Sequence, residues 1–203
     1  MDLIIGAAIG PTEITSDKTA RASLRWVMSK ERFMNQIEIR WANYSDWQQL
    51  GCVHSESYRS AYQSIIPDDF LEDFTVEKQQ EYYREILSEG QKRIAIMFAD
   101  KKAIGLIIVG KCLDEDLDET FGEIRQIYLL KEYWGKGFGK RLINWGIDKI
   151  KEYGYFRTAL WVLKENVNAR RFYEHLGFIC DGKEKLIRRG KELVQVRYQK
   201  TFE

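Results

Sequence analysis

The stretch YWGKGFGKRL, residues 133 to 142, decides the fold of this chain, because three glycines at alternate positions stand directly before a helical pattern. Glycine is needed where the backbone adopts positive φ or where a side chain would block a ligand. A turn of this kind between a strand and a helix presents free backbone N–H groups at the positive end of the helix dipole. The turn therefore predicts a ligand that contains phosphate.

Two common phosphate-binding motifs do not match this turn. The dinucleotide pattern GxGxxG requires glycine where the chain has Lys140. The Walker A pattern GxxxxGK[ST] requires Ser or Thr where Arg141 follows that lysine. The turn must therefore be interpreted together with the rest of the chain.

The hydrophobic pattern predicts a regular α/β order around the turn. Strands are expected at 37–43, 93–100, 102–112, 123–130 and 157–166, with a terminal hairpin over 178–200. Helices are expected from Ser45 or Asp46 to Tyr62, after Pro67 over 68–88, over 138–154 and over 168–177. The order is thus strand, two helices, three strands, helix, strand, helix and two strands.

The amino-acid composition argues against several classes of partner and against a bound metal. The 32 Lys and Arg residues against 31 Asp and Glu give a net charge of +1, which predicts no nucleic-acid partner and no attachment to an anionic membrane. Cys52, Cys112 and Cys180 lack the spacing of a disulfide framework or a zinc site, so we expect no bound metal and a reducing, cytoplasmic location. The start MDLIIGAAIG is neither a signal peptide nor long enough to span a bilayer.

Two parts of the chain differ in pattern. Residues 1–33 read as an N-terminal appendage with a helical stretch after Pro11, and residues 34–203 as one domain that could equally begin at Met34. The appendage packs on the domain or on a partner, or it is an extension without function.

The glycine turn resembles the acyl-CoA pyrophosphate loop of the GNAT superfamily of acetyltransferases, usually written [QR]-x-x-G-x-[GA]. Gly137 and Gly139 fill its glycine positions, and Trp134 stands where Gln or Arg is typical. The segment ENVNARRFYEHLGF, which begins at residue 165, resembles a second family motif, N-x-x-A-x-x-x-Y-x-x-x-G-F. Its matching residues are Asn166, Ala169, Tyr173, Gly177 and Phe178.

This resemblance covers about residues 37 to 200. It implies an α/β (α+β) fold with a single GNAT-like domain. The expected central sheet is mixed and mostly antiparallel, with about seven strands splayed between the fourth and fifth. About four helices flank it.

The resemblance also implies a cofactor site for acetyl-CoA. The pyrophosphate would lie on backbone amides, with added positive charge from two lysines, along the residues Gly135, Lys136, Gly137, Phe138, Gly139 and Lys140. The pantetheine arm would pair with an open strand edge formed by Ile127, Tyr128 and Leu129. We expect a bulge at Leu129 and Leu130 to open this edge, and the Leu129 amide to stabilise the oxyanion.

Two proton transfers remain in the implied reaction. Tyr173 matches the family's general acid, although a tyrosine on a helix can also be plain core. Glu123 opens the strand that carries Leu129 and is the candidate base, directly or through water, with a solvated strand-end carboxylate as the alternative. Asn166 would place the pantetheine or cap the short helix.

The acceptor pocket of such folds is made by the first two helices, their connection and the later hairpins. Here the substrate-binding candidates are Tyr58, Tyr62 and Ser64, with Asp68 and Asp69 beside them. Aromatic rings near carboxylates suit an amine, as they also suit an ordinary amphipathic helix. The acidic run DEDLDE at 114–119 either attracts that amine or is a solvated loop. His54, on the first helix, either binds substrate or is structural, as a lone histidine more often is.

The predicted function is an N-acetyltransferase that moves the acetyl group of acetyl-CoA to a primary amine of a small molecule or peptide. Direct attack in a ternary complex is expected. The alternative is a non-catalytic acyl-CoA-binding regulatory module. A homodimer formed through the terminal strands or residues 1–33 is left open.

Overall fold

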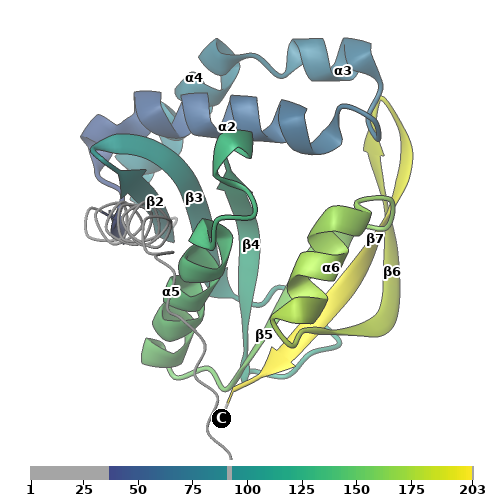
Figure 1. Ribbon diagram of the computed structural model, residues 1–203. Coiled ribbons are helices and arrows are strands. Elements are labelled where there is room, and N and C mark those ends of the chain that lie inside the picture. The colour runs from purple at the N-terminus through teal and green to yellow at the C-terminus, as the bar shows by residue number, and fades with distance from the viewer. Residues whose placement is uncertain (1–36, 91–92, 203) are drawn as a thin grey trace, which may run out of the picture. The chain divides into compact units, whose positions relative to one another are not determined.

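A computed structural model of the chain describes residues 37–90 and 93–202, so the expected appendage at 1–33 lies outside the described residues. One sheet contains seven strands in the order β1-β2-β3-β4-β5-β7-β6 (Figure 1). The strands are β1 Ile37–Trp41, β2 Arg93–Ala99, β3 Lys102–Lys111, β4 Phe121–Leu129, β5 Arg157–Leu163, β6 Ile179–Arg189 and β7 Lys191–Thr201. The helices are α2 Trp47–Tyr62, α3 Asp68–Asp73, α4 Val76–Glu89, α5 Phe138–Glu152 and α6 Val167–His175, with short 3-10 turns η1 Tyr44–Asp46 and η2 Lys131–Tyr133.

The predicted mixed, mostly antiparallel sheet is confirmed. β2, β3 and β4 are antiparallel neighbours, β4 and β5 are parallel, and β7 is antiparallel to both β5 and β6. The described residues hold five α-helices where about four were expected, because the stretch after Pro67 divides into α3 and α4. Thr75 causes this division: its backbone is extended, and its hydroxyl accepts a hydrogen bond from the Lys78 amide and so caps a new helix.

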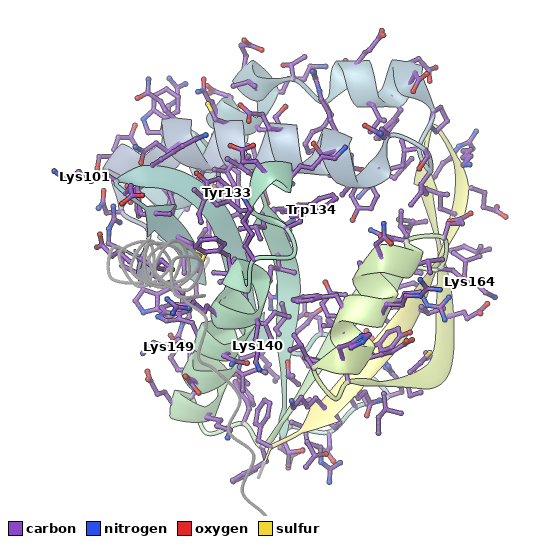
Figure 2. All side chains as sticks on the ribbon, viewed as in Figure 1. Lys101, Tyr133, Trp134, Lys140, Lys149 and Lys164 are labelled. Atoms are coloured by element: carbon purple, nitrogen blue, oxygen red, sulfur yellow. The ribbon has the colours of Figure 1, made fainter. Side chains whose placement is uncertain are left out.

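The turn predicted between β2 and β3 is also present. Asp100 and Lys101 both adopt left-handed backbone angles, with φ of 49° and 65°. Two such residues form the tight connection that matches the twist of a hairpin. Lys101 marks this turn in Figure 2.

Helices cover both faces of the sheet around β3. Leu106 and Ile108 belong to a buried cluster with Leu50 and Val53 of α2. Ile107 points to the opposite face, where a Cβ on Gly146 of α5 would lie 2.5 Å from its Cδ1. α2 and α5 therefore lie on opposite faces, and a residue larger than glycine at position 146 would require the Ile107 side chain to move.

The predicted splay between the fourth and fifth strands is confirmed. β4 pairs with β5 only where Phe121–Glu123 lies beside Arg157–Ala159. Beyond that point the two strands diverge, as Figure 1 shows. The later half of β4 thus pairs with β3 on one side and has no strand partner on the side that faces β5.

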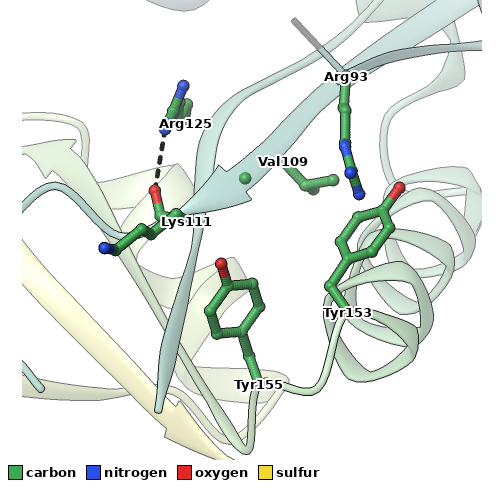
Figure 3. Close-up of a pocket in the computed structure, with 7 residues that line it drawn as sticks. Arg93, Val109, Lys111, Arg125, Tyr153 and Tyr155 are labelled. Atoms are coloured by element: carbon green, nitrogen blue, oxygen red, sulfur yellow. Dashed lines mark hydrogen bonds between the residues drawn. The ribbon is translucent and has the colours of Figure 1, made fainter. Parts of the chain in front are cut away.

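The bulge expected at Leu129 and Leu130 was wrongly placed. The register of β4 against β3 shifts between Ile108 and Val109, which leaves Arg125 as the extra residue of β4. The Arg125 guanidinium lies over Gly110, where a Cβ would be 3.2 Å from its Cζ. Its Nη2 donates a 2.9 Å hydrogen bond to the Lys111 carbonyl (Figure 3). Glycine at position 110 therefore permits the bulge, which lies directly after the point where β5 leaves β4.

Candidate active site

The glycine turn has the backbone that phosphate binding requires. Gly135 and Gly137 adopt φ of 70° and 86°, and a Cβ on either would meet nothing within 4 Å. Gly137 is the N-cap of α5, and its carbonyl accepts the first helical hydrogen bond, from the Arg141 amide at 3.1 Å. The amides of residues 138–140 precede that bond, so they have no helical acceptor and remain available to an anion.

Gly139 and Phe138 have packing roles that the sequence analysis did not separate from ligand binding. A Cβ on Gly139 would lie 3.1 Å from Cζ of Phe172 on α6 and 3.9 Å from Cδ2 of Leu129 on β4. The Phe138 side chain is buried and packs edge-on against Tyr133, with ring centroids 5.4 Å apart. Only the backbone of Phe138 can therefore serve a cofactor, whereas Lys136 and Lys140 are exposed.

The open edge of β4 presents alternate peptide groups. The Leu130 amide donates to the Ile104 carbonyl of β3 at 2.9 Å. Because antiparallel strands alternate the direction of successive residues, the N–H and C=O groups of Leu129 and Ile127 point away from β3, toward the open side. Those of Tyr128 point toward β3. Two of the three predicted edge residues thus offer backbone groups to a ligand.

Tyrosine side chains gather beside this edge. Tyr173 of α6 is 7% exposed, and burial together with the nearby Tyr62 raises the pKa of its phenol above the ordinary value. Burial also raises the pKa of Tyr62 to about 12, and that phenol interacts with Tyr128. Tyr58 packs against Tyr62 with ring centroids 4.6 Å apart. The predicted acid and two predicted acceptor residues therefore belong to one cluster, in which the phenols remain protonated donors at neutral pH.

The short helix α6 is fixed at both ends. Asn166 Oδ1 accepts a 3.1 Å hydrogen bond from the Ala169 amide, which establishes the capping role, whereas its contact with pantetheine remains a prediction. The Tyr173 ring packs between Phe178 and Tyr198, at centroid distances of 5.8 and 6.3 Å.

Ser64, the third predicted acceptor residue, is exposed in the turn after α2.

Glu123 lies apart from the tyrosine cluster. It stands where β4 still pairs with β5, six residues before Leu129, a distance of roughly 20 Å along a strand. Its side chain is 13% exposed, so the solvated alternative does not describe it. Burial raises the pKa of this carboxyl, although Arg125, 3.4 Å away, opposes the shift. Among the described residues Oε2 accepts no hydrogen bond of good geometry, and its ion-pair partner is the Arg125 Nε.

Carboxylates of the acidic run at 114–119 form ion pairs in the structure. Arg197, whose side chain is 5% exposed, binds Asp114, Asp116 and Asp181 at 3.1, 2.7 and 2.7 Å. Arg197 also holds the pKa of the Asp116 carboxyl well below its usual range. Trp161 donates its indole N–H to Asp114 at 3.0 Å. Asp114 and Asp116 are therefore already paired, whereas Glu115, Asp118 and Glu119 are exposed on the loop, in agreement with the solvated-loop alternative.

His54 lies in the core, as its structural interpretation requires. The ring is 5% exposed, and Nδ1 lies 3.2 Å from the Tyr83 hydroxyl. Burial lowers its pKa to about 4, so the ring is neutral at physiological pH.

A separate pocket, which the sequence analysis missed, opens at the far end of α5 (Figure 3). Its lining includes Arg93, Val109, Tyr153 and Tyr155, and the Arg93 guanidinium lies 3.5 Å from the centre of the Tyr153 ring. Hydrophobic periodicity predicted the strands and the helix that meet here, but not that their ends leave a hollow. None of the predicted site residues lines this pocket.

Within the described residues, no group of three or more His, Cys, Asp or Glu side chains is arranged to hold a metal ion. In the same part of the chain, no helix combines the length and apolar character needed to cross a membrane.

The family model for the acetyltransferase (GNAT) family matches residues 59–178, more than half of the chain. The chain belongs to the GNAT acetyltransferase family. The predicted enzyme class, an acyltransferase, is confirmed by this membership. The matched range of this GNAT chain begins within α2 and ends after α6, so it includes the glycine turn and Tyr173.

Similar proteins agree with the fold and the cofactor class. A spermidine N(1)-acetyltransferase of Thermoplasma acidophilum is 28% identical over 148 residues, which cover 70% of this GNAT chain and 88% of that protein. The PaiA N-acetyltransferase of the same organism, solved with coenzyme A, has a TM-score of 0.62 at 24% identity and covers 82% of this chain and 99% of its own. YncA of Salmonella typhimurium, solved with its cofactor acetyl-CoA, has a TM-score of 0.59 at 16% identity, with 83% and 95% covered. The predicted cofactor, acetyl-CoA, is consistent with both complexes.

Proposed function

We propose that this chain is an N-acetyltransferase that transfers the acetyl group of acetyl-CoA to a primary amine of a small molecule or peptide, by direct attack in a ternary complex. One observation carries the proposal. A Cβ added to Gly139, in the first turn of α5, would lie within 4 Å of the Phe172 ring on α6 and of the Leu129 side chain on β4. The anion-binding turn, the open strand edge and the helix of the candidate acid therefore meet at one place.

The residues present fit coenzyme A. Gly135 and Gly137 leave open space above the turn, and the amides of residues 138–140 lack helical acceptors. Lys136 and Lys140 add positive charge beside these amides. The open edge at Ile127 and Leu129 offers alternate N–H and C=O groups to an arm that contains amides. Acetyl-CoA supplies an activated acyl thioester when it is bound.

The proposed role of Leu129 is to donate its N–H to the oxygen that becomes negative during attack. A preorganised backbone donor of this kind stabilises the transition state without reorganisation. Tyr173 is the proposed donor of the proton that a departing thiolate requires, since a phenol carries its proton at neutral pH. Holding amine and thioester together contributes the remaining acceleration.

Glu123 is the proposed base, and its distance from Leu129 requires that it act through water rather than by contact. Burial favours proton uptake by this carboxylate because it raises the pKa. Tyr58 and Tyr62, with Ser64 in the following turn, are the proposed acceptor contacts. Aromatic rings attract an alkylammonium group through their electron-rich faces.

A non-catalytic acyl-CoA-binding module is the second candidate. The observation that favours it is the separation of Glu123 from the Leu129 amide, which leaves no carboxylate at the point of attack within the predicted site. Such a module would bind acetyl-CoA without releasing thiol on any amine.

The test is thiol release from acetyl-CoA across a panel of amines that includes spermidine, amino acids and peptides. Tyr173→Phe is expected to lower turnover by about 100-fold and to leave coenzyme A binding unchanged. Tyr153→Phe, at the far end of α5, is the matched control and is expected to keep wild-type turnover. Binding without turnover on every amine would favour the module, and full turnover by Tyr173→Phe would contradict its role as acid.

A further inference from the structure

The only polar side-chain atom of Trp134, its indole Nε1, forms a hydrogen bond within the protein. Its indole Nε1 donates a 2.8 Å hydrogen bond to the carbonyl of Leu129. An indole has one donor and no acceptor, so this bond leaves it nothing to offer a phosphate. Trp134 therefore differs in kind from the Gln or Arg that stands at this position in the loops it resembles, since those side chains carry several donors.

The carbonyl that Trp134 binds belongs to the open edge of β4. The Leu130 amide is turned to Ile104 on β3, so the Leu129 carbonyl points to the opposite side, where a cofactor arm would add. Part of the hydrogen-bonding capacity of this edge is thus occupied from within the chain. Figure 2 shows Trp134 on the segment between β4 and α5, beside Tyr133.

The segment that carries Trp134 is fixed on both sides. Its backbone N–H donates to the Lys131 carbonyl at 3.1 Å, and Glu132 forms a 2.8 Å ion pair with Lys102 at the start of β3. Tyr133 packs on Phe138, the first residue of α5. Within this segment the indole hydrogen bond links Trp134 directly to Leu129, the last residue of β4. The Trp134 side chain remains 39% exposed.

We propose that Trp134 is a positioning residue for acyl transfer. By holding the Leu129 carbonyl it fixes the backbone of that residue, so that the Leu129 N–H stays directed into the open edge. It also leaves the cofactor arm one hydrogen-bond position fewer at this residue, so the Leu129 N–H remains for the oxygen of the thioester. This inference rests on the proposed function, and it adds a residue that the family pattern does not assign to this task.

Trp134→Phe keeps a large ring and removes the N–H. Loss of one hydrogen bond that orients the oxyanion donor is expected to lower kcat about tenfold, while KM for acetyl-CoA changes less than about threefold. Trp145→Phe is the matched control, because Trp145 lies on α5 and packs against Trp41 at a centroid distance of 4.7 Å. It is expected to keep wild-type kcat. Unchanged kcat in Trp134→Phe would overturn the proposal.

A second measurement needs no turnover. In a nitrogen–proton correlation spectrum, the indole signal absent from Trp134→Phe identifies the Trp134 N–H. That signal is expected to exchange slowly with solvent in the free protein and to stay protected when coenzyme A is added. Fast exchange in the free protein, or loss of protection on binding, would overturn the inference. No spectral change anywhere on addition of coenzyme A would instead contradict the proposed function.

Discussion

The ring of Phe172 lies against Gly139, such that a Cβ added to the glycine would be 3.1 Å from Cζ of the ring. A methyl group at this distance requires the ring to move by a few tenths of an ångström. Gly139→Ala is therefore expected to change the melting temperature little, whereas Gly139→Val forces α6 away from α5 and lowers the affinity for coenzyme A. Isothermal titration calorimetry and thermal unfolding check both.

The double variant Gly139→Val with Phe172→Ala provides the control. Removal of the ring is expected to recover most of the affinity that Gly139→Val loses, because the clash has a single partner on α6. If the double variant binds no better than Gly139→Val alone, contact with Phe172 is not the reason for glycine at this position.

Gly137 is required by its backbone angle rather than by packing. At φ of 86°, with nothing within 4 Å of a Cβ, Gly137→Ala is expected to lower the free energy of unfolding by about 1 kcal/mol. It is also expected to weaken coenzyme A binding roughly tenfold, because strain relief moves the amides that follow.

Gly90→Ala is the matched control for Gly137→Ala. Gly90 ends α4 at φ of 64° with equally open surroundings, so it should show a similar loss of stability. Its coenzyme A affinity should equal that of the wild type. Equal affinity losses in the two variants would show that the effect is general destabilisation and not a property of the turn.

The pH dependence of kcat/KM tests Glu123. Because burial raises its pKa, the acidic limb is expected to lie at higher pH than an ordinary glutamate would give. Glu123→Gln is expected to remove this limb and to lower the rate by about tenfold, less than for a base in direct contact. An unchanged acidic limb in Glu123→Gln would mean that another group accepts the proton.

His54 makes stability depend on pH. Its pKa is about 4 in the folded chain and about 6.5 for an ordinary, solvated histidine, so the unfolded chain binds the proton first as the pH falls. Stability is therefore expected to decrease below about pH 6.5, by up to roughly 3 kcal/mol near pH 4 and below.

Denaturant unfolding between pH 7 and pH 4 measures this effect. His54→Gln keeps a polar partner for Tyr83 and should flatten the dependence. A steep dependence that persists in His54→Gln would assign the effect to other groups.

Much of the fold follows from local patterns in the chain. The glycine turn, the alternating strands and the amphipathic α5 predict the element order, and the two family motifs predict the splay of β4 from β5. Asn166 and Gly137 begin their helices as their residue types suggest. The division between α3 and α4 had a readable signal in Thr75, a good N-cap residue within an otherwise helical stretch.

The remaining features depend on contacts between distant segments. The bulge lies at Arg125 because Gly110, on the neighbouring strand, leaves room for the guanidinium. The bond between Trp134 and Leu129 and the packing of Gly139 on Phe172 likewise require the fold to be assembled first. Glu123 was expected as a base acting directly or through water, and strand geometry, which separates it from Leu129, leaves the route through water. No single-sequence pattern reports such distances.

Titration of coenzyme A into the wild-type chain by calorimetry tests the central claim most directly. Saturable binding at one site per chain is expected, with competition from inorganic pyrophosphate at the glycine turn. Absence of binding to the wild-type chain, or binding that Gly137→Ala and Gly90→Ala weaken equally, would contradict the assignment of the turn as the diphosphate site.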